Sequence, residues 1–237
     1  MSLDELRRQF RKAGEPAVAE VMRRFFKTGP GEYGEGDKFL GLKVPTTRSF
    51  LPDTDSLLLN ELEELLHSDW HEERLLALLA LVRRYKKARK DLGLREAIVA
   101  FYLKNTRWIN NWDLVDTSAP HILGEWLFDR DRAVLRRLAR SKDLWEQRIA
   151  VLATQAFIRK GDFDLTLELC HELLSHKHDL MHKACGWMLR EIGNRDVHVL
   201  LAFLDRHAHL MPRTMLRYAI EKLPEKQRMH VLATSKQ

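Results

Sequence analysis

The stretch Asn110-Asn111-Trp112-Asp113-Leu114-Val115-Asp116 has the pattern of a helix that begins at Trp112. In a helix, Trp112 and Asp116 stand four residues apart on one face, so a flat aromatic surface lies beside a carboxylate. Asp113 falls where a negative charge suits the positive end of the helix dipole, and we interpret it as structural. Pro120 then kinks or interrupts the helix, because its ring removes a backbone donor.

Helices of the same kind recur along the chain. They open near Trp70, Trp112, Trp145, Met181 and Met211, at spacings of about 30 to 42 residues, and each follows another helix. Such spacing is typical of helical-hairpin repeats of the HEAT type. The sequence therefore predicts an all-α fold, a right-handed superhelix (solenoid) of HEAT-like hairpins with a concave, basic face. An irregular helical bundle is the alternative.

The remaining helical patterns complete this picture. The segment from Gly29 to Gly41 holds five glycines and one proline, which predicts a loop. We expect a single domain over residues 1–237, with N-terminal helices and this loop in 1–54 and hairpin repeats in 55–237. No strand is predicted. The expected helices cover 3–13, 16–27, a short helix that ends at about Leu51, 55–67, 70–88, 91–105, 130–140, 144–159, 162–175, 179–193, 197–207, 212–222 and 224–233.

Composition limits the class of protein. The chain has 237 residues, of which 45% are hydrophobic and 31% charged, as in soluble helical proteins. No run of about 18 apolar residues suggests a membrane span, and the acidic, polar N-terminus is unlike a secretory signal. Cys170 and Cys185 lack the spacing of a disulfide scaffold or zinc finger. We therefore expect a cytoplasmic protein.

The net charge of +6 is unevenly distributed. Residues 1–120 contain 20 Lys and Arg against 19 Asp and Glu, whereas residues 121–237 contain 20 against 15. The surplus in the C-terminal half suits a polyanion such as nucleic acid. A solvated basic surface explains it equally well.

Several other side chains have two interpretations each. Trp112 and Trp187 are either core residues or aromatic walls for a sugar, a base or a cation. Arg148 and Arg190 either bind phosphates or form ion pairs within the protein. A short helix after Pro45 offers either an anion site at its N-terminus or an ordinary cap by Thr46 or Thr47. The residues concerned there are Lys43, Thr46, Thr47 and Arg48.

The histidines do not predict a metal site. His178 and His182 lie four residues apart, with His171 and His176 nearby, but there is no HExxH motif and such spacing is common. Motifs for phosphate-binding loops, dinucleotides and serine hydrolases are also absent from the sequence. We expect neither a metal nor a cofactor.

Three segments in this order carry a resemblance to a known family. They are Asn111–Asp116, Trp145–Arg148 and His182–Glu191, with the patterns WDxVD, WxQR and HKAxGWxLRE. Together they resemble the AlkD family of DNA alkylation repair glycosylases, over most of the chain from about Ala17. The resemblance implies a HEAT-like solenoid whose concave face holds duplex DNA.

The resemblance also implies roles for individual residues. The second acid of WDxVD, here Asp116, matches the catalytic carboxylate of the family, and Trp112 and Trp187 match its two aromatic walls. Arg148 matches a basic residue on the phosphate side, and Arg190 is a further backbone contact. Phe26 stands near a position where some relatives have tyrosine, and we count it among the residues expected to contact DNA.

The implied activity is removal of cationic N3- or N7-alkylated purines from double-stranded DNA, which leaves an abasic site. We expect a monomer, because a solenoid closes its own core and DNA would occupy the concave face. Two alternatives stay open on the sequence alone. One is a relative that binds DNA without excising bases, and the other is a HEAT scaffold that binds proteins.

Overall fold

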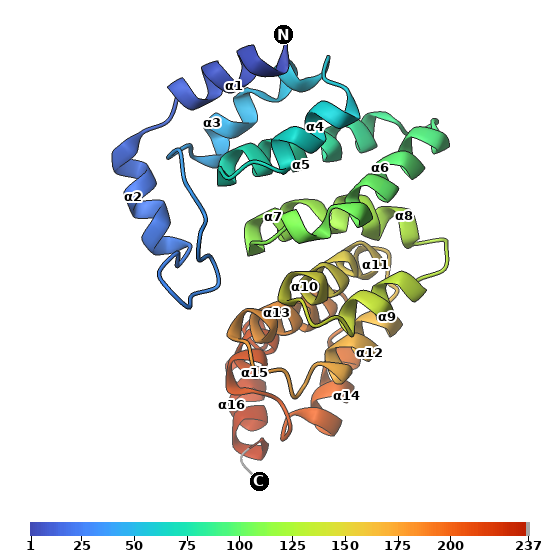
Figure 1. Cartoon of the computed structure of the whole chain (residues 1–237). Helices are drawn as coiled ribbons and strands as arrows, with labels where there is room; N and C mark the ends of the chain where they lie inside the picture. Colours follow the sequence, from blue (N-terminus) through green and yellow to red (C-terminus); the bar gives the residue numbers. More distant parts are fainter. Residues whose placement is uncertain (236–237) are drawn as a thin grey trace. The chain divides into compact units, whose positions relative to one another are not determined.

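The computed structural model describes residues 1–235, and the regular secondary structure of these residues is helical (Figure 1). The only extended pairing among them is an isolated parallel bridge between Lys38 and Trp70. The all-α prediction is therefore confirmed. The chain divides into two compact units, Met1–Ser118 and Ala119–Gln237. The prediction of one repeat domain stays a prediction, and its last residues, 236–237, lie outside the described part.

The first unit is built around one long helix. This helix, α5, spans His71–Lys87, and every residue from His71 to Val82 is buried. Helices α3, α4, α6 and α7 all pack against it. The elements of the unit are α1 (Leu3–Lys12), α2 (Pro16–Phe25), α3 (Val44–Ser49), η1 (Leu51–Thr54), α4 (Leu59–Leu66), α5, α6 (Leu92–Lys104), η2 (Thr106–Trp108) and α7 (Trp112–Ser118).

The second unit begins with the interruption that Pro120 predicts. A π-helical turn, η3, covers Pro120–Gly124 in place of a continuous α-helix, because the proline ring cannot donate the regular hydrogen bond. The elements that follow are α8 (Glu125–Leu127), α9 (Ala133–Ala139), α10 (Leu144–Ala153), α11 (Gln155–Arg159), α12 (Asp164–Glu172), α13 (Asp179–Arg195), α14 (Val197–His207), α15 (Arg213–Ala219) and α16 (Glu225–Thr234).

Within each unit, consecutive helices pack as pairs. Helix α4 packs on α5, α9 on α10, and α12 on α13. The second helices also pack on one another, α5 on α7 in the first unit and α10 on α13 on α15 in the second. These second helices are the ones whose openings recur in the sequence, so the predicted starts near residues 70, 112, 145, 181 and 211 are confirmed.

A regular spacing of contacts accompanies this packing in the second unit. Arg136 on α9 and Arg140, the C-cap residue of α9, form ion pairs with Glu168 and Glu172 on α12. In both pairs the partners are 32 residues apart, as are Arg148 and the Leu180 carbonyl to which it donates. The spacing lies within the range that the sequence predicts for one hairpin.

The Gly29–Gly41 segment is a loop, as predicted, and its end is held by a buried carboxylate. Glu72 accepts hydrogen bonds from the backbone N–H groups of Leu40, Gly41 and Leu42. Gly41 has φ +86°, and a Cβ there would lie 2.1 Å from the Glu15 carbonyl oxygen. Only glycine fits, because the conformation is left-handed and the backbone of α2 approaches closely.

One predicted cap is wrong. Helix α3 begins at Val44, and its N-cap is Lys43. Thr46 and Thr47 therefore lie inside the helix, with Thr46 exposed and Thr47 fully buried. Pro45 occupies the first turn, where a missing backbone N–H costs nothing, and so the helix starts earlier than the threonines suggest.

Close packing between α13 and α15 depends on Gly186. A Cβ at this position would lie 2.5 Å from the Met215 carbonyl oxygen and 2.5 Å from the Tyr218 Cβ. Both obstacles are rigid parts of α15. The glycine in the GWxLRE pattern thus lets two helices approach each other.

We expect Gly186→Ala to lower the free energy of unfolding by about 2 kcal/mol or more, because α15 must shift. Gly193→Ala on the same helix is the matched control. There the nearest atom is the flexible Leu200 Cδ2, and alanine gains about 1 kcal/mol of helix propensity. Urea unfolding of both variants measures the difference, and equal stability of the two would contradict the packing argument.

Candidate active site

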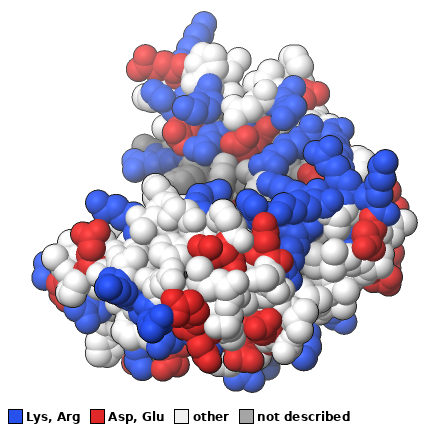
Figure 2. All heavy atoms as spheres, turned by 90° about the horizontal axis from the view of Figure 1, so that it is seen from above, with Lys and Arg blue, Asp and Glu red and all other residues white. Residues whose placement is uncertain are grey.

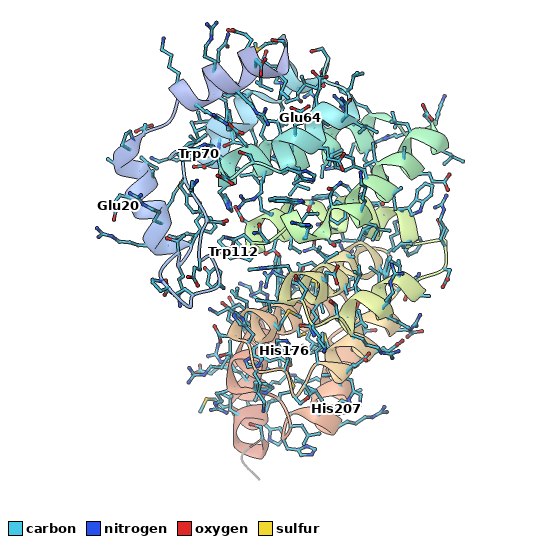
Figure 3. All side chains as sticks on the ribbon, in the orientation of Figure 1. Glu20, Glu64, Trp70, Trp112, His176 and His207 are labelled. Atoms are coloured by element: carbon cyan, nitrogen blue, oxygen red, sulfur yellow. The ribbon has the colours of Figure 1, made fainter. Side chains whose placement is uncertain are left out.

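The segment before α7 fixes where Trp112 lies. Asn111 is fully buried, and its Oδ1 accepts a hydrogen bond from the Trp112 backbone N–H at 2.8 Å. Helix α7 starts at this residue, and Trp112 lies at its beginning (Figure 3). Trp112 and Asp116 are both partly exposed. Because they are four residues apart on this helix, they share one face, as predicted.

Three aromatic side chains pack in and around a stack with the Trp112 ring. The ring stacks on Phe26, with centroids 5.3 Å apart and planes 17° apart, and Phe26 stacks in turn on Phe39 at 5.0 Å. Phe25 packs edge-on against Trp112 at 5.9 Å and is otherwise 63% exposed. Phe26 itself is buried. It shapes the candidate site from beneath the indole.

Asp116 lies one turn further along α7, near a buried phenol. Burial raises the pKa of Tyr102, a hydrogen bond with Ser118 opposes that shift, and the charge of Asp116 raises the pKa further. Tyr102 and Ser118 hydroxyls lie 2.8 Å apart. The charge of Asp116 therefore acts on a buried neighbour, while the Asp116 residue itself is partly exposed.

The other acid of α7, Asp113, belongs to a buried polar cluster. His71 Nε2 lies 2.8 Å from Asp113 Oδ2, and His71 Nδ1 lies 3.2 Å from Asp37 Oδ2. Arg74 donates to Asp37 Oδ1 at 2.6 Å. Asn111 donates to Asp37 Oδ2 at 3.2 Å. We call these five residues the His71 cluster. The structural interpretation of Asp113 is thus supported by its contacts.

The charges in the His71 cluster balance only when His71 is protonated. Burial alone would lower the pKa of His71, but the charge of Asp113 and the hydrogen bonds with Asp113 and Asp37 raise it to about 9. Burial would likewise raise the pKa of Asp37, but the hydrogen bond from His71 and the charge of Arg74 hold it below its usual value. A protonated imidazole can donate to both carboxylates, whereas a neutral one can donate to only one.

The third predicted catalytic residue, Trp187, and two predicted DNA-binding residues, Arg148 and Arg190, belong to the second unit. Arg148 on α10 is 4% exposed, and its guanidinium donates to the Leu180 carbonyl at 2.7 Å. Trp187 on α13 is partly exposed, and its Nε1 donates to Glu191 at 3.1 Å. Arg190, one turn on, forms an ion pair with Glu221. Helices α10 and α13 pack directly on each other.

The predicted anion-binding residues after the loop are only partly accessible. Lys43, Thr46 and Arg48 are exposed on and beside α3, but Thr47 is buried. Figure 2 shows Lys and Arg side chains in a dense local group, while acidic side chains are scattered. This distribution is compatible with either a polyanion partner or a solvated surface.

The histidines near α13 have structural partners. The His178 side chain caps α13 by accepting from the Leu180 N–H at 3.1 Å. His176 Nε2 lies 2.9 Å from Gln147 Oε1. Among residues 1–235, no group of three His, Cys, Asp or Glu side chains is placed to hold a metal ion.

Comparison with known proteins connects these features to a family. The profile of the DNA alkylation repair enzymes matches residues 6–223. The chain belongs to this family. Its fold is similar to a solved structure described as a predicted DNA alkylation repair enzyme from Enterococcus faecalis, with a TM-score of 0.68 and 15% identity. The alignment covers 90% of this chain and 97% of that one. A search among curated proteins finds no match.

Family membership gives this chain a role in DNA alkylation repair, with DNA as the substrate. No described helix is long and apolar enough to cross a membrane. The sequence patterns did not predict the His71 cluster or the Phe26–Phe39 stack. The one available signal was the run His71-Glu72-Glu73-Arg74, four polar residues directly before a long apolar stretch.

The raised pKa of His71 predicts a pH-dependent stability. The stabilisation by protonated His71 is fully present below its unfolded pKa of 6.5 and is lost as pH rises through about 9. We expect urea unfolding to show a decline in stability over this window, and His71→Gln to show a smaller decline. Identical pH dependence in both proteins would contradict a charged His71.

Proposed function

We propose that the protein is a monofunctional DNA glycosylase that hydrolyses the N-glycosidic bond of cationic N3- or N7-alkylated purines in duplex DNA. The observation that carries the proposal is the Trp112–Asp116 pair, a tryptophan and an aspartate that are both partly exposed and share one face of α7. Their positions in the WDxVD pattern, in a chain of the DNA alkylation repair family, support the same assignment.

The two acids of α7 have different surroundings, which suits this chemistry. Asp113 is bound to His71, while Asp116 lies at the accessible surface beside Trp112. An alkylated purine is already cationic, so it leaves with the bonding electron pair as a neutral base. No general acid is needed. Positive charge then develops on the deoxyribose, and a fixed carboxylate stabilises it electrostatically.

Asp116 has a second task in the proposed reaction. As the bond from C1′ to the purine nitrogen breaks, a water molecule forms a new bond to C1′, and Asp116 orients this water and accepts its proton. The indole of Trp112 favours the developing cation through its π face. From its place in the GWxLRE pattern, we propose that the indole of Trp187 also favours the developing cation. The product is an abasic site.

In this proposal, two groups of basic and polar side chains contact the DNA backbone. Arg148 and Arg190 would contact the phosphate backbone near Trp187, and Lys43, Thr46 and Arg48 would contact it near α3. Arg148 is largely buried, so its contribution includes holding α10 against the Leu180 carbonyl. We further propose that the protein acts as a monomer in the cytoplasm, on the nucleoid.

Asp116→Asn tests the carboxylate directly. We expect it to lower the single-turnover release of 7-methylguanine from a methylated duplex by about a hundredfold or more, because the fixed negative charge is lost. DNA affinity should stay close to native, since the amide has the same shape. Asp205→Asn, which removes an exposed acid from α14, is the matched control and should release the base at the native rate.

Undiminished release by Asp116→Asn would exclude Asp116 as the catalytic carboxylate. If the native protein releases no base but binds DNA, the chain is a non-catalytic DNA-binding relative.

Lesion-free duplex binding across a salt series separates DNA binding from a protein-binding scaffold. We expect the logarithm of the association constant to fall steeply with the logarithm of salt concentration, since each neutralised phosphate releases counterions. Fluorescence anisotropy of a labelled duplex provides the measurement. Weak binding that does not depend on salt would favour the scaffold.

A further inference from the structure

The residues directly before and after Trp112 in the sequence both belong to the buried His71 cluster. Asn111, the residue before it, donates to Asp37, and Asp113, the residue after it, contacts His71. His71 also contacts Asp37, so a single histidine joins the two anchors. The backbone at the start of α7 therefore cannot shift unless these buried contacts break.

The same histidine supports the indole ring through space. The imidazole packs against Phe26 with centroids 4.9 Å apart and stacks on Phe39 at 4.7 Å. Phe26 also stacks on Trp112, with centroids 5.3 Å apart. Phe26 thus contacts both the imidazole of His71 and the indole of Trp112. Because close-packed rings leave no space for independent movement, the position of the imidazole determines the position of the indole.

The loop takes part in this arrangement through Asp37. The Asp37 side chain is 6% exposed, and its carboxylate accepts hydrogen bonds from His71, Arg74 and Asn111. Phe39, two residues further on, lies under Phe26. The Gly29–Gly41 loop is therefore tied both to the polar cluster and to the aromatic stack beneath the candidate site.

We propose that His71 is a positioning residue, which fixes the ring of Trp112 and the first turn of α7, with Asp37 of the loop as its partner. For its catalytic consequence the inference rests on the proposed function. His71 is 2% exposed and lies beneath Phe26, so it acts through its neighbours and does not touch the substrate. Breaking the cluster lets the indole tilt, and small misplacements of a reacting group are costly.

The test needs a control that destabilises the same helix without touching the stack. Glu73 is suitable, since its fully buried carboxylate pairs with Arg11 at 2.6 Å and Arg7 at 3.6 Å, on α1. Glu73→Gln therefore perturbs the start of α5 through its contacts with α1. His71→Gln and Asp37→Asn are the two test variants. Both keep a similar side-chain volume, and either one suffices if the other does not fold.

The first readout is independent of activity. The protein contains six tryptophans, and labelling with 5-fluorotryptophan gives each a fluorine resonance, with Trp112→Phe assigning that of Trp112. We expect His71→Gln and Asp37→Asn to shift or broaden the Trp112 resonance and to leave those of Trp126, Trp145 and Trp187 in place. Glu73→Gln should leave the Trp112 resonance unmoved. An unmoved Trp112 signal in the test variants, or an equal shift in Glu73→Gln, overturns the proposal.

The second readout is single-turnover release of 7-methylguanine at a temperature where all variants are folded. We expect the rate to fall about tenfold for the test variants, while affinity for unmodified duplex changes less than about twofold. Glu73→Gln should keep the native rate. An equal loss of rate in Glu73→Gln overturns the positioning role.

The two readouts also separate this inference from the proposed function. A native protein that releases no base refutes the glycosylase, and the fluorine spectra then decide by themselves whether His71 holds Trp112.

Discussion

The first unit depends on four polar residues that are buried in succession at the start of α5. His71, Glu72, Glu73 and Arg74 are each 3% exposed or less. Burying such groups is costly unless every one finds a partner. Together they bind three parts of the unit and the residues before α5. His71 binds α7 and the loop, Glu72 binds the loop end, Glu73 binds helix α1, and Arg74 binds the loop and the Ser68 carbonyl. One helical turn thus joins most of the unit.

This arrangement explains how a surface site can be rigid. An indole at the first position of a short helix would ordinarily be mobile, because α7 has only seven residues and helix ends fray. Here the residues on both sides of Trp112 are bound to buried groups, and the ring itself lies on a stack of aromatic side chains. Rigid support of this kind is what electrostatic catalysis requires, since stabilisation of a developing charge depends on groups already in place.

The different surroundings of two acids on the same helix also give them different roles. Asp113 and Asp116 are three residues apart and chemically identical. Asp113 meets a buried imidazolium and holds the helix, whereas Asp116 stays accessible beside the indole. The proposed glycosylase chemistry uses only the accessible acid. Membership of the DNA alkylation repair family supplies the DNA substrate on which this acid would act.

The sequence by itself determined the helices, their recurrence and the shared face of Trp112 and Asp116. These features are local, because helical periodicity, proline and glycine act over a few residues. The sequence also indicated that Asp113 is structural, although through the helix dipole and not through His71. Only the tertiary structure decided which charged residues are buried and what they bind. His71 and Asp113 are 42 residues apart, and Asp37 and Asn111 are 74 apart. No local pattern encodes such pairs, because they form only when packing excludes water and each buried charge must find a partner.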